Sequence, residues 1–348
     1  MSNTYTGANG KTYITEAQPL GKGGEGEAYR IHGNPDLVLQ LYLPSYRTEG
    51  RHRKLLAMIQ SSSKSDALRQ QTTWPVDVVY DNGSFVGYVM PLVSGVKTLN
   101  EIYSDNDVYS LSEKIVIAKN LCAAVHSIHQ AGQVIGDFNP NIICFEPNTG
   151  LVTLIVTDSY HITDNEGRIY RCGFAIPEFT AKELQDKLKY NKTLSLHNLP
   201  LPTFTKETDL FALAIHIFTL LMNGCHPFAS AVDSIVIASR TSVVNPQPFE
   251  NIRNGFFPFY IKKAGYTIPQ YAPDFSVLPK AIRDLFVKAF VDGSANPSVR
   301  PSALEWYEAL SEFEKHLKHC SINNRHEFFD QLITCPWCEL EKRYNNND

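Results

Sequence analysis

The chain has 348 residues with an ordinary share of apolar and charged side chains, as expected for a soluble globular protein large enough for two domains or lobes. Its formal net charge of -4 argues against a strongly basic nucleic-acid-binding surface. No apolar run reaches the roughly 20 residues that cross a bilayer, and the polar N-terminus lacks a signal-peptide core. We therefore expect a cytoplasmic protein that does not span a membrane and has no evident nucleic-acid-binding surface.

Strand-like segments dominate the first ninety residues. A glycine-rich loop, Leu20–Arg30, precedes a strand-like run at Asp36–Tyr42 and a helix-like segment at Glu49–Gln60. Two further strand-like pieces, 76–80 and 84–90, flank an Asp-Asn-Gly sequence that is typical of a hairpin turn. This pattern predicts a mostly β region that contains one helix.

The glycine-rich loop carries Gly21, Gly23, Gly24 and Gly26. Without Cβ atoms, such a loop lets backbone N–H groups approach phosphate oxygens. A plain hairpin turn would have the same composition. A dinucleotide-binding βαβ unit is disfavoured, because no long apolar helix follows and no acidic residue stands where a ribose partner belongs.

From about Leu99 onward the pattern becomes helical. Helices are predicted at 111–131, 205–222, 278–291 and 302–317. Between the first two, the apolar runs Ile142–Phe145 and Leu151–Val156 are joined by Glu-Pro-Asn-Thr-Gly, which predicts a hairpin.

Two aspartates flank this predicted hairpin. Asp137 precedes its first strand and Asp158 follows its second, so we expect both carboxylates at one end. Paired acids at one rim suit metal-assisted chemistry. In the alternative interpretation, Asp137 caps a turn with Asn139 and Pro140, and Asp158 merely begins a loop.

The C-terminal region contains a compact set of metal-binding residue types. Cys320, His326, Cys335 and Cys338 are spaced C-x5-H-x8-C-x2-C, and three thiols with one imidazole suit tetrahedral zinc. The alternative is three ordinary cysteines in a terminal helical hairpin. The other four cysteines lie in apolar surroundings and are expected to be buried; they are Cys122, Cys144, Cys172 and Cys225.

Six motifs, taken in order, resemble the eukaryotic-type protein kinase fold over roughly residues 14 to 316. They are the glycine-rich loop, Val134–Pro140 for the catalytic loop, Thr157–Tyr160 for the D-F-G segment, Ala181–Glu183 for A-P-E, Asp209–Ala212 and Arg300–Ser302. The chain most resembles a bacterial kinase-like group in four stretches: the sequence LGKGGEGEAY, the GD-x-NP loop, Asn223–Phe228 and the terminal CPWC. That group occurs with a phosphatase and a von Willebrand A-type protein in tellurite-resistance-associated phosphorylation modules.

The resemblance implies a bilobal α+β fold. It would comprise a small β lobe at 1–92, a larger helical lobe at 93–316 and a zinc-binding tail at 317–348. ATP would bind between the lobes under the glycine-rich loop, and its γ-phosphate would be transferred to Ser or Thr of a protein.

The resemblance also assigns roles to single residues. Asp137 would accept the proton of the substrate hydroxyl, and Asp158 would bind magnesium. Asn139 stands where many kinases have a lysine near the transferred phosphate. The second metal ligand, an asparagine in kinases, aligns with Ile142, although a loop shorter by one residue would offer Asn141.

Two further expectations concern support of the fold. The resemblance places Glu183 and Arg300 in a buried ion pair, and it places Asp209 against backbone N–H groups of the catalytic loop.

Gln40 occupies the position of the kinase lysine that pairs with the α- and β-phosphates, and its amide carries no charge. Glu49 is the nearest candidate for that lysine's usual glutamate partner. Three explanations stay open: a natural pseudokinase that serves as a nucleotide-sensing or partner-binding scaffold, an inactivated version of a working kinase, or a relocated lysine such as Lys22. The presence of isoleucine at position 142, where kinases have the second metal-binding asparagine, favours natural loss of the catalytic site.

Overall fold

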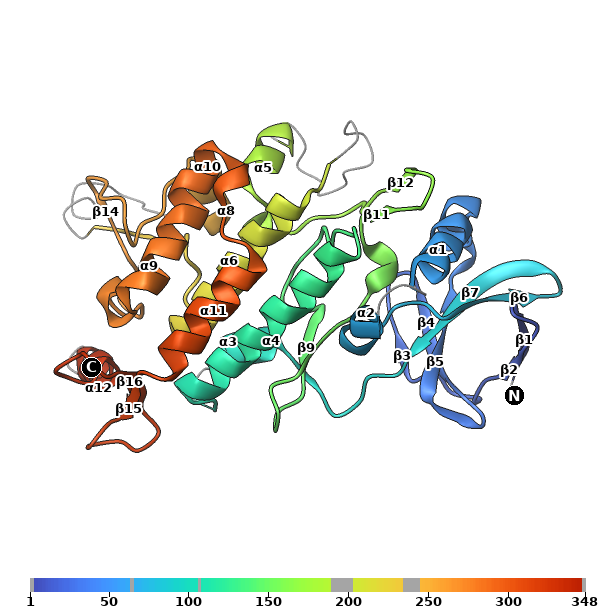
Figure 1. Ribbon diagram of the computed structural model, residues 1–348, viewed down its shortest axis with the longest axis horizontal. Helices are drawn as coiled ribbons and strands as arrows, with labels where there is room; N and C mark the ends of the chain where they lie inside the picture. The colour runs from blue at the N-terminus through green and yellow to red at the C-terminus, as the bar shows by residue number, and fades with distance from the viewer. Residues whose placement is uncertain (1–2, 63–65, 106–107, 189–202, 234–244, 346–348) are drawn as a thin grey trace. The chain divides into compact units, whose positions relative to one another are not determined.

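The computed structural model describes residues 3–62, 66–105, 108–188, 203–233 and 245–345 (Figure 1). The chain folds as two compact units, each described by itself below. Unit 1 comprises 1–96, 127–135 and 153–172, and unit 2 comprises 97–126, 136–152 and 173–348. The division into two lobes and a tail stays a prediction, and residues 346–348 of the tail lie outside the described ranges.

A seven-stranded antiparallel sheet forms the body of unit 1, in the order β2-β1-β6-β7-β5-β4-β3. Its strands are β1 (Thr4–Gly7), β2 (Thr12–Ile14), β3 (Gly21–Lys22), β4 (Gly26–Ile31), β5 (Asn34–Tyr42), β6 (Asp77–Asp81) and β7 (Ser84–Pro91). Leu39 of β5 packs with Tyr5, Val79 and Val89 in a buried apolar cluster. The strands predicted at 36–42, 76–80 and 84–90 are therefore confirmed.

The turn between β6 and β7 is the predicted hairpin turn. Asn82 has φ of 47° and Gly83 has φ of 81°, and two left-handed residues at the tip match the right-handed twist of the flanking strands. Asn and Gly adopt this conformation at low cost, which is why the local sequence sufficed to predict it.

Two helices accompany the sheet, where the sequence predicted one. The predicted helix is α1 (Glu49–Ser62), which buries Leu55 and Met58. The additional helix, α2 (Asp66–Gln71), is only six residues long and carries little apolar periodicity. After it, the buried Trp74 donates its indole N–H to the carbonyl of Met58 at 2.7 Å, which fixes the chain against α1.

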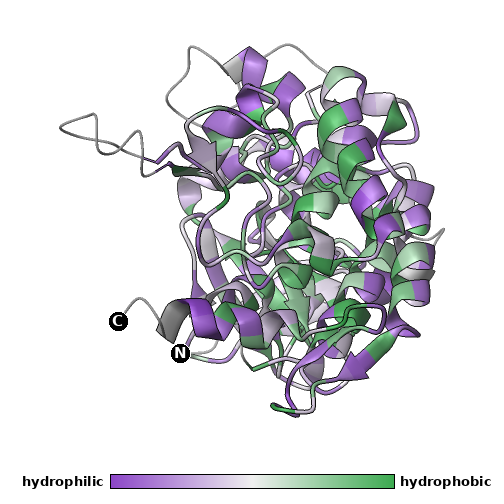
Figure 2. Ribbon diagram, turned by 90° about the vertical axis from the view of Figure 1, so that its left-hand side faces the viewer, coloured by the Kyte–Doolittle hydropathy of each residue, from purple (hydrophilic) through white to green (hydrophobic). Residues whose placement is uncertain are grey.

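Unit 2 consists mainly of helices. They are α3 (Leu99–Ser104), α5 (Lys182–Leu188), α6 (Lys206–Leu221), α8 (Pro248–Arg253), α9 (Lys280–Val287), α10 (Gly293–Ala295), α11 (Ala303–Glu314) and α12 (Pro336–Asn345), while α4 (Leu111–Gln130) has residues in both units. Buried side chains line almost all of α6. In Figure 2 the helices carry hydrophilic and hydrophobic residues side by side, and α12 near the C-terminus shows both.

Of the last two predicted helices, only the second ends earlier than expected. The helix predicted at 278–291 is α9, and it continues as a π-helical turn at Lys288–Asp292. The helix predicted at 302–317 ends at Glu314, because Leu317 already begins a strand. That strand, β15 (Leu317–His319), pairs antiparallel with β16 (Glu327–Phe329), and periodicity alone could not show this long-range pairing.

Short strands complete the structure. The predicted hairpin at 142–156 has shorter strands than expected, β9 (Ile143–Phe145) and β10 (Val152–Leu154), and its turn is closed by the Glu146 N–H, which donates to the Leu151 carbonyl at 2.9 Å. The remaining short strands are β8 (Lys97–Thr98), which pairs with β9, β11 (Ile162–Thr163) with β12 (Ile169–Tyr170), and β13 (Ala231–Val232) with β14 (Tyr266–Thr267).

This mixed α+β architecture is consistent with the bilobal kinase-like fold that the resemblance implied, with a Cys/His cluster near the C-terminus. Cys122, Cys144, Cys172 and Cys225 are buried as predicted. Within the described ranges, none of the helices combines the length and hydropathy that a bilayer crossing requires.

Candidate functional site

The tip of the glycine-rich loop is open enough for a ligand to approach the backbone. The Gly23 N–H donates to the Gly26 carbonyl at 2.8 Å, which closes a tight turn between β3 and β4. A Cβ atom at Gly21 or Gly24 would meet nothing within 4 Å, and at Gly23 its nearest neighbour would be 3.8 Å away. The loop therefore has the bare backbone and free space that phosphate contact needs.

Gly26 serves a different purpose in this structure. A Cβ atom there would lie 2.1 Å from the carbonyl oxygen of Leu41 and 2.7 Å from Nε2 of Gln40. The absence of a side chain at Gly26 thus lets β4 and β5 pair closely, and it brings the amide of Gln40 against the backbone of the loop.

Gln40 lies in the middle of β5, paired with Ala28 of β4 and Tyr88 of β7. Its side chain projects to the same face of the sheet as that of Tyr42, because side chains two residues apart share a face of a strand. Leu39 and Leu41 point to the opposite face, toward the apolar cluster. The sheet therefore has one apolar face and, at Gln40 and Tyr42, one polar face.

Asp158 lies on a 3-10 turn, Thr157–Ser159, in unit 1. The Tyr42 hydroxyl donates to Oδ2 of Asp158 at 2.6 Å, and Nη1 of Arg51 lies 3.9 Å from the same oxygen. Only 9% of the Asp158 side chain is exposed. The carboxylate is therefore directed toward the polar face of the sheet.

The turn that carries Asp158 is held from both sides. The Thr157 hydroxyl donates to the carbonyl of Thr73 at 2.9 Å, and the Ser159 hydroxyl donates to the carbonyl of Val156 at 2.8 Å. Val156 itself has φ of 57°, a left-handed conformation that a β-branched residue rarely adopts.

Arg51 of α1 connects the glycine-rich loop to the helix. Its guanidinium donates two parallel hydrogen bonds to the carboxylate of Glu25, at 2.7 and 2.6 Å. The same guanidinium lies over the rings of Tyr42 and Tyr46. Burial alone would lower the pKa of Arg51, but the two hydrogen bonds to Glu25 and the charges of its neighbours raise it overall. The same two bonds fix the position of the glycine-rich loop relative to α1.

Lys54 lies one turn beyond Arg51, on the buried side of α1 with Leu55 and Met58, and is 8% exposed. Burial lowers the pKa of Lys54 to about 8, while Cys172, Asp158 and Glu25 act in the opposite direction. The ammonium group therefore stays largely protonated at pH 7. We call Glu25, Tyr42, Arg51, Lys54 and Asp158 the Asp158 network.

Two residues named in the sequence analysis do not belong to this network. Lys22 is 69% exposed and pairs with Glu27 at 2.7 Å, so it is a solvated loop residue. Glu49, the first residue of α1, is 65% exposed and pairs with Arg53 at 2.8 Å. Neither side chain contacts Gln40 in the part of the chain that the structure describes.

Asp137 belongs to unit 2, in a loop that several contacts hold in shape. Its Oδ1 accepts a hydrogen bond from the Ile176 N–H at 3.1 Å. Burial raises the pKa of Asp137, although the Ile176 N–H and the Asn139 side chain oppose this. Gly136 has φ of 89°, and its N–H donates to Oδ1 of Asp209 at 3.0 Å. The predicted contact of Asp209 with the loop backbone is confirmed.

The residues after Asp137 differ in their exposure. Asn139 is 5% exposed, and its side chain bonds within the loop: Nδ2 donates to the Asp137 carbonyl at 3.3 Å, and Oδ1 accepts from the Asn141 N–H at 3.0 Å. The Asn141 side chain is exposed, whereas Ile142 is buried at 8% exposure. Of the two positions considered for a second metal ligand, only Asn141 presents an accessible oxygen.

His216 of α6 was not singled out by the sequence, yet it holds the same loop. Its Nε2 lies 3.1 Å from the Phe138 carbonyl, and its Nδ1 lies 3.0 Å from the Tyr103 hydroxyl. Burial lowers the pKa of His216 to about 3, against the hydrogen bond to Phe138. The neutral ring must then donate from Nε2 to the carbonyl and accept at Nδ1 from the tyrosine.

The predicted ion pair of Glu183 and Arg300 is confirmed. The guanidinium donates to both carboxylate oxygens, at 2.7 and 2.8 Å, and also to the carbonyls of Glu207 and Gly293 at 2.8 Å each. The Arg300 side chain is 0% exposed, whereas that of Glu183 is 31% exposed. This pair connects α5 to the segment that precedes α11, and its role is structural.

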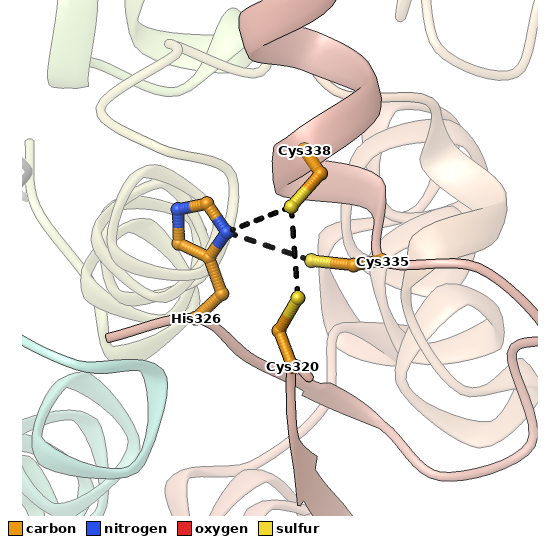
Figure 3. A group of neighbouring side chains, drawn as sticks. All are labelled: Cys320, His326, Cys335 and Cys338. Carbon is orange, nitrogen blue, oxygen red and sulfur yellow. Dashed lines mark hydrogen bonds between the residues drawn. The ribbon is translucent and has the colours of Figure 1, made fainter. Parts of the chain in front are cut away.

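The four predicted metal ligands converge (Figure 3). Cys320 follows β15 and His326 precedes β16. Cys335 immediately precedes α12, and Cys338 lies in the first turn of that helix. Their ligand atoms all lie within 4.8 Å of one another. Sγ of Cys320 is 3.6 Å from Sγ of Cys338, and Nδ1 of His326 is 3.6 and 3.4 Å from the sulfurs of Cys335 and Cys338.

These distances match those of a zinc tetrahedron. With Zn–S bonds of about 2.3 Å and Zn–N bonds of about 2.0 Å, two sulfurs lie about 3.8 Å apart, and a sulfur and a nitrogen about 3.5 Å. The outer nitrogen of His326, Nε2, lies 3.3 Å from a carboxylate oxygen of Glu341, a contact that orients a ligating imidazole. The cluster thus fits a closed structural zinc site.

The sequence motifs did not point to three residues of the Asp158 network, because only the packing of the folded chain brings these residues to Asp158. Tyr42, Arg51 and Lys54 carry no motif. Their one local signal is that Arg51 and Lys54 fall on the same side of α1 as Leu55 and Met58, where an apolar residue would be usual. A buried cation on an otherwise apolar helix face calls for a nearby anion.

Comparison with known proteins adds a second line of observation. No family model matches the chain. The chain is 29% identical over 363 residues to Protein kinase YegI of Escherichia coli O157:H7, which covers 99% of this chain and 51% of that protein. It is 29% identical over 349 residues to Protein kinase YegI of Escherichia coli strain K12, which covers 94% and 49%. The chain thus spans about half the length of these curated relatives, and the similarity supports a kinase-like protein.

Proposed function

We propose that this chain is a protein kinase that transfers the γ-phosphate of ATP to Ser or Thr of a protein. The observation that carries the proposal is the loop around Asp137. Its Gly136 N–H is bound by Asp209 and its Phe138 carbonyl by His216, while Asp137 itself is held by the Ile176 N–H. Similarity to a protein kinase along nearly the whole chain supports the same conclusion.

Each candidate residue has a distinct task in this proposal. Asp137 accepts the proton of the substrate hydroxyl, and a pKa raised by burial makes its carboxylate a better base than an exposed aspartate. Asp158 of unit 1 would hold magnesium. Within unit 2, Asn141 is the position that offers an accessible side-chain oxygen, in contrast to the buried Ile142. Magnesium would neutralise charge on the phosphates during transfer.

The nucleotide phosphates are assigned to the glycine-rich loop. Gly21, Gly23 and Gly24 offer backbone N–H groups at the open tip, and Gly26 lets the loop approach β5. Gln40 contributes a neutral hydrogen-bond donor where kinases place a lysine. Asn139 is turned inward to the loop backbone, so its contribution to the nucleotide site is to shape the loop.

A second candidate function is a pseudokinase that binds nucleotide or partner proteins without transfer. The observation that favours it is the crowding of Asp158, whose Oδ2 is contacted by Tyr42 and Arg51, together with the missing charge at Gln40. In this case Asp158 would serve the fold of unit 1 instead of magnesium.

We also propose zinc as the ion of the Cys320, His326, Cys335 and Cys338 cluster, in a structural role. The cytoplasmic location that the sequence composition led us to expect stays a proposal. The phosphatase and the von Willebrand A-type protein are proposed as partners from the resemblance to the bacterial kinase-like group alone. A protein substrate or protein partner is the broader expectation.

The deciding experiment is incubation with labelled ATP and magnesium, followed by analysis of labelled amino acids in the protein and in added Ser/Thr-rich substrates. Transfer by the natural chain or by Gln40→Lys, abolished in Asp137→Asn and Asp158→Asn, is the expected result. Asp164→Asn is the matched control, since the Asp164 carboxylate accepts hydrogen bonds only within the turn between β11 and β12, from the Glu166 and Arg168 N–H groups and the Tyr170 hydroxyl, among the residues that the structure describes. The kinase proposal would be overturned if neither the natural chain nor Gln40→Lys produced any labelling. ATP binding without transfer would favour the pseudokinase.

A further inference from the structure

Lys54 is a cation in a position where burial is costly. Moving an ammonium group out of water is unfavourable unless an anion compensates it. Lys54 is 8% exposed and lies on the buried face of α1, next in that face to Leu55 and Met58. An apolar side chain would fill this position at lower cost, so the ammonium group calls for a specific explanation.

The surroundings of Lys54 are the parts of unit 1 that the proposed function assigns to the phosphates. Asp158, the proposed magnesium ligand, and Glu25, in the glycine-rich loop, both act on Lys54 electrostatically, as do Cys172 and Arg51. Arg51, one turn earlier on the same helix, lies 3.9 Å from Asp158 and is bonded to Glu25. Lys54 therefore lies one helical turn from a guanidinium that contacts both of these acids.

The charge at this place is reversed relative to the kinase pattern. In that pattern the strand supplies a lysine and the helix a glutamate. Here the strand supplies the neutral Gln40, and the helix supplies Lys54. Lys22, the other candidate for a relocated cation, is exposed and paired with Glu27.

We propose that Lys54 is the phosphate-binding cation of this chain, and that it replaces from α1 the charge that Gln40 lacks on β5. The inference rests on the proposed function, because it requires ATP as the ligand. It deepens that function by naming the residue that recognises the phosphates. Arg51 is less suited to this task, since both of its outer nitrogens are already engaged by Glu25.

The test is a set of binding measurements by calorimetry, with magnesium present, for ATP and for adenosine. A hydrogen bond to a charged group contributes enough that Lys54→Met is expected to weaken ATP binding tenfold to about a hundredfold. Adenosine has no phosphate, so its affinity is expected to stay within about twofold. Lys54→Arg is expected to keep most of the ATP affinity, because it keeps the charge.

Two further variants make the test specific. Lys54→Met combined with Gln40→Lys is expected to regain ATP affinity, because the charge returns from the strand. Lys280→Met is the matched control, because this lysine of α9 is 79% exposed and paired with Asp284, so its loss is expected to leave ATP binding unchanged. If thermal unfolding shows that Lys54→Met is not folded, Lys54→Gln takes its place with the same expected loss.

The outcomes separate this inference from the proposed function. If the natural chain binds ATP but Lys54→Met binds it equally well, or loses ATP and adenosine affinity alike, the assignment of Lys54 is overturned while the nucleotide site stands. If the folded natural chain and Gln40→Lys both fail to bind ATP at millimolar concentration, the proposed function is overturned and the inference with it. A selective loss of ATP affinity with rescue by Gln40→Lys supports both.

Discussion

The Cys/His cluster and the Asp158 network differ in how much of the chain is needed to assemble them. Cys320 and Cys338 are 18 residues apart in the chain, and all four ligands come from one hairpin and the start of one helix. Tyr42 and Asp158 are 116 residues apart, and their network needs the sheet, α1 and the 3-10 turn to be in place.

This difference separates a site that a metal can organise from one that packing must organise. Ligand spacing is enough to bring four donors to one ion, because metal binding itself supplies folding free energy. The Asp158 network has no such organiser, and its geometry is only as firm as the contacts between elements. Substitutions in the two regions are therefore expected to have different consequences.

The largest effect is expected in the Cys/His cluster. The purified chain is expected to contain one zinc ion, and Cys335→Ser with Cys338→Ser is expected to remove it, because two of four ligands are lost. Binding of structural zinc supplies about 10–16 kcal/mol in zinc-finger peptides, so residues 317–345 are expected to unfold locally. Metal analysis and limited proteolysis measure both changes.

The matched control for the zinc prediction is Cys144→Ala, which removes a buried thiol from β9, outside the cluster. Zinc content is expected to stay at one ion per chain in this variant. A double variant at Cys335 and Cys338 that keeps its tail protected from protease without metal would contradict the assignment.

A second effect tests a long-range contact that does not depend on a metal. Arg300→Ala removes the buried partner of Glu183 and leaves the carbonyls of Glu207 and Gly293 without their donor. Breaking a buried pair in this way is expected to lower the free energy of unfolding by about 3–5 kcal/mol, measured by urea unfolding. Lys288→Ala breaks a pair with Glu305 that is exposed on both sides, and it should cost less than about 1 kcal/mol. Equal losses in the two variants would be inconsistent with this account.

A smaller effect is expected at the Asp158 network. Tyr42→Phe keeps the ring but removes the hydroxyl that donates to Asp158 at 2.6 Å. Because a hydrogen bond to a charged group contributes about 1.5–3 kcal/mol, the free energy of unfolding is expected to fall by that amount. Tyr46→Phe is the control, since that ring also lies beneath Arg51 but makes no such bond to Asp158. If both variants unfold at the same urea concentration, the Tyr42 contact contributes nothing.

The smallest effect is a slope with pH at His216. Burial lowers the pKa of His216 from 6.5 to about 3, so below pH 6.5 the unfolded chain takes up a proton that the folded chain does not. Stability therefore falls as the pH drops from 6.5 toward 3, with a contribution of at most about 1.4 kcal/mol per pH unit. His216→Gln, which keeps an N–H donor for the Phe138 carbonyl, is expected to reduce this slope.

The slope is measured by urea unfolding at several pH values between about 4.5 and 6. His319→Gln is the control, because that side chain is 72% exposed. Identical slopes for the natural chain and His216→Gln would show that the buried histidine does not control the acid response.

The sequence predicted the parts of the molecule that local patterns determine. The β6–β7 turn, α1, α4 and α6 follow from hairpin chemistry and helical periodicity, and the ligands of the Cys/His cluster follow from spacing. The strand β15 was mistaken for the end of a helix, because its partner β16 lies beyond the reach of a local pattern. Motif order also predicted the backbone contact of Asp209 and the Glu183–Arg300 pair, whereas the catalytic roles of Asp137 and Asp158 stay predictions.

The remainder of the candidate site could not be derived from motifs. Gln40 was recognised only as a missing charge, and the sequence suggested Lys22 as a replacement because that residue lies in the glycine-rich loop. The position of Lys54 depends on which side of α1 is buried and on the turn around Asp158, and both are fixed by long-range packing. A single sequence gives no measure of such contacts.

The left-handed backbone of Val156 has a consequence for the energy balance of unit 1. A β-branched residue in this conformation raises the free energy of the native state by roughly 1–3 kcal/mol, and unfolding relieves it. The Thr157 and Ser159 hydrogen bonds and the buried Leu154 and Tyr160 must offset this strain. The segment before Asp158 thus stores backbone strain. The orientation of the Asp158 carboxylate is maintained at the expense of the local stability of unit 1.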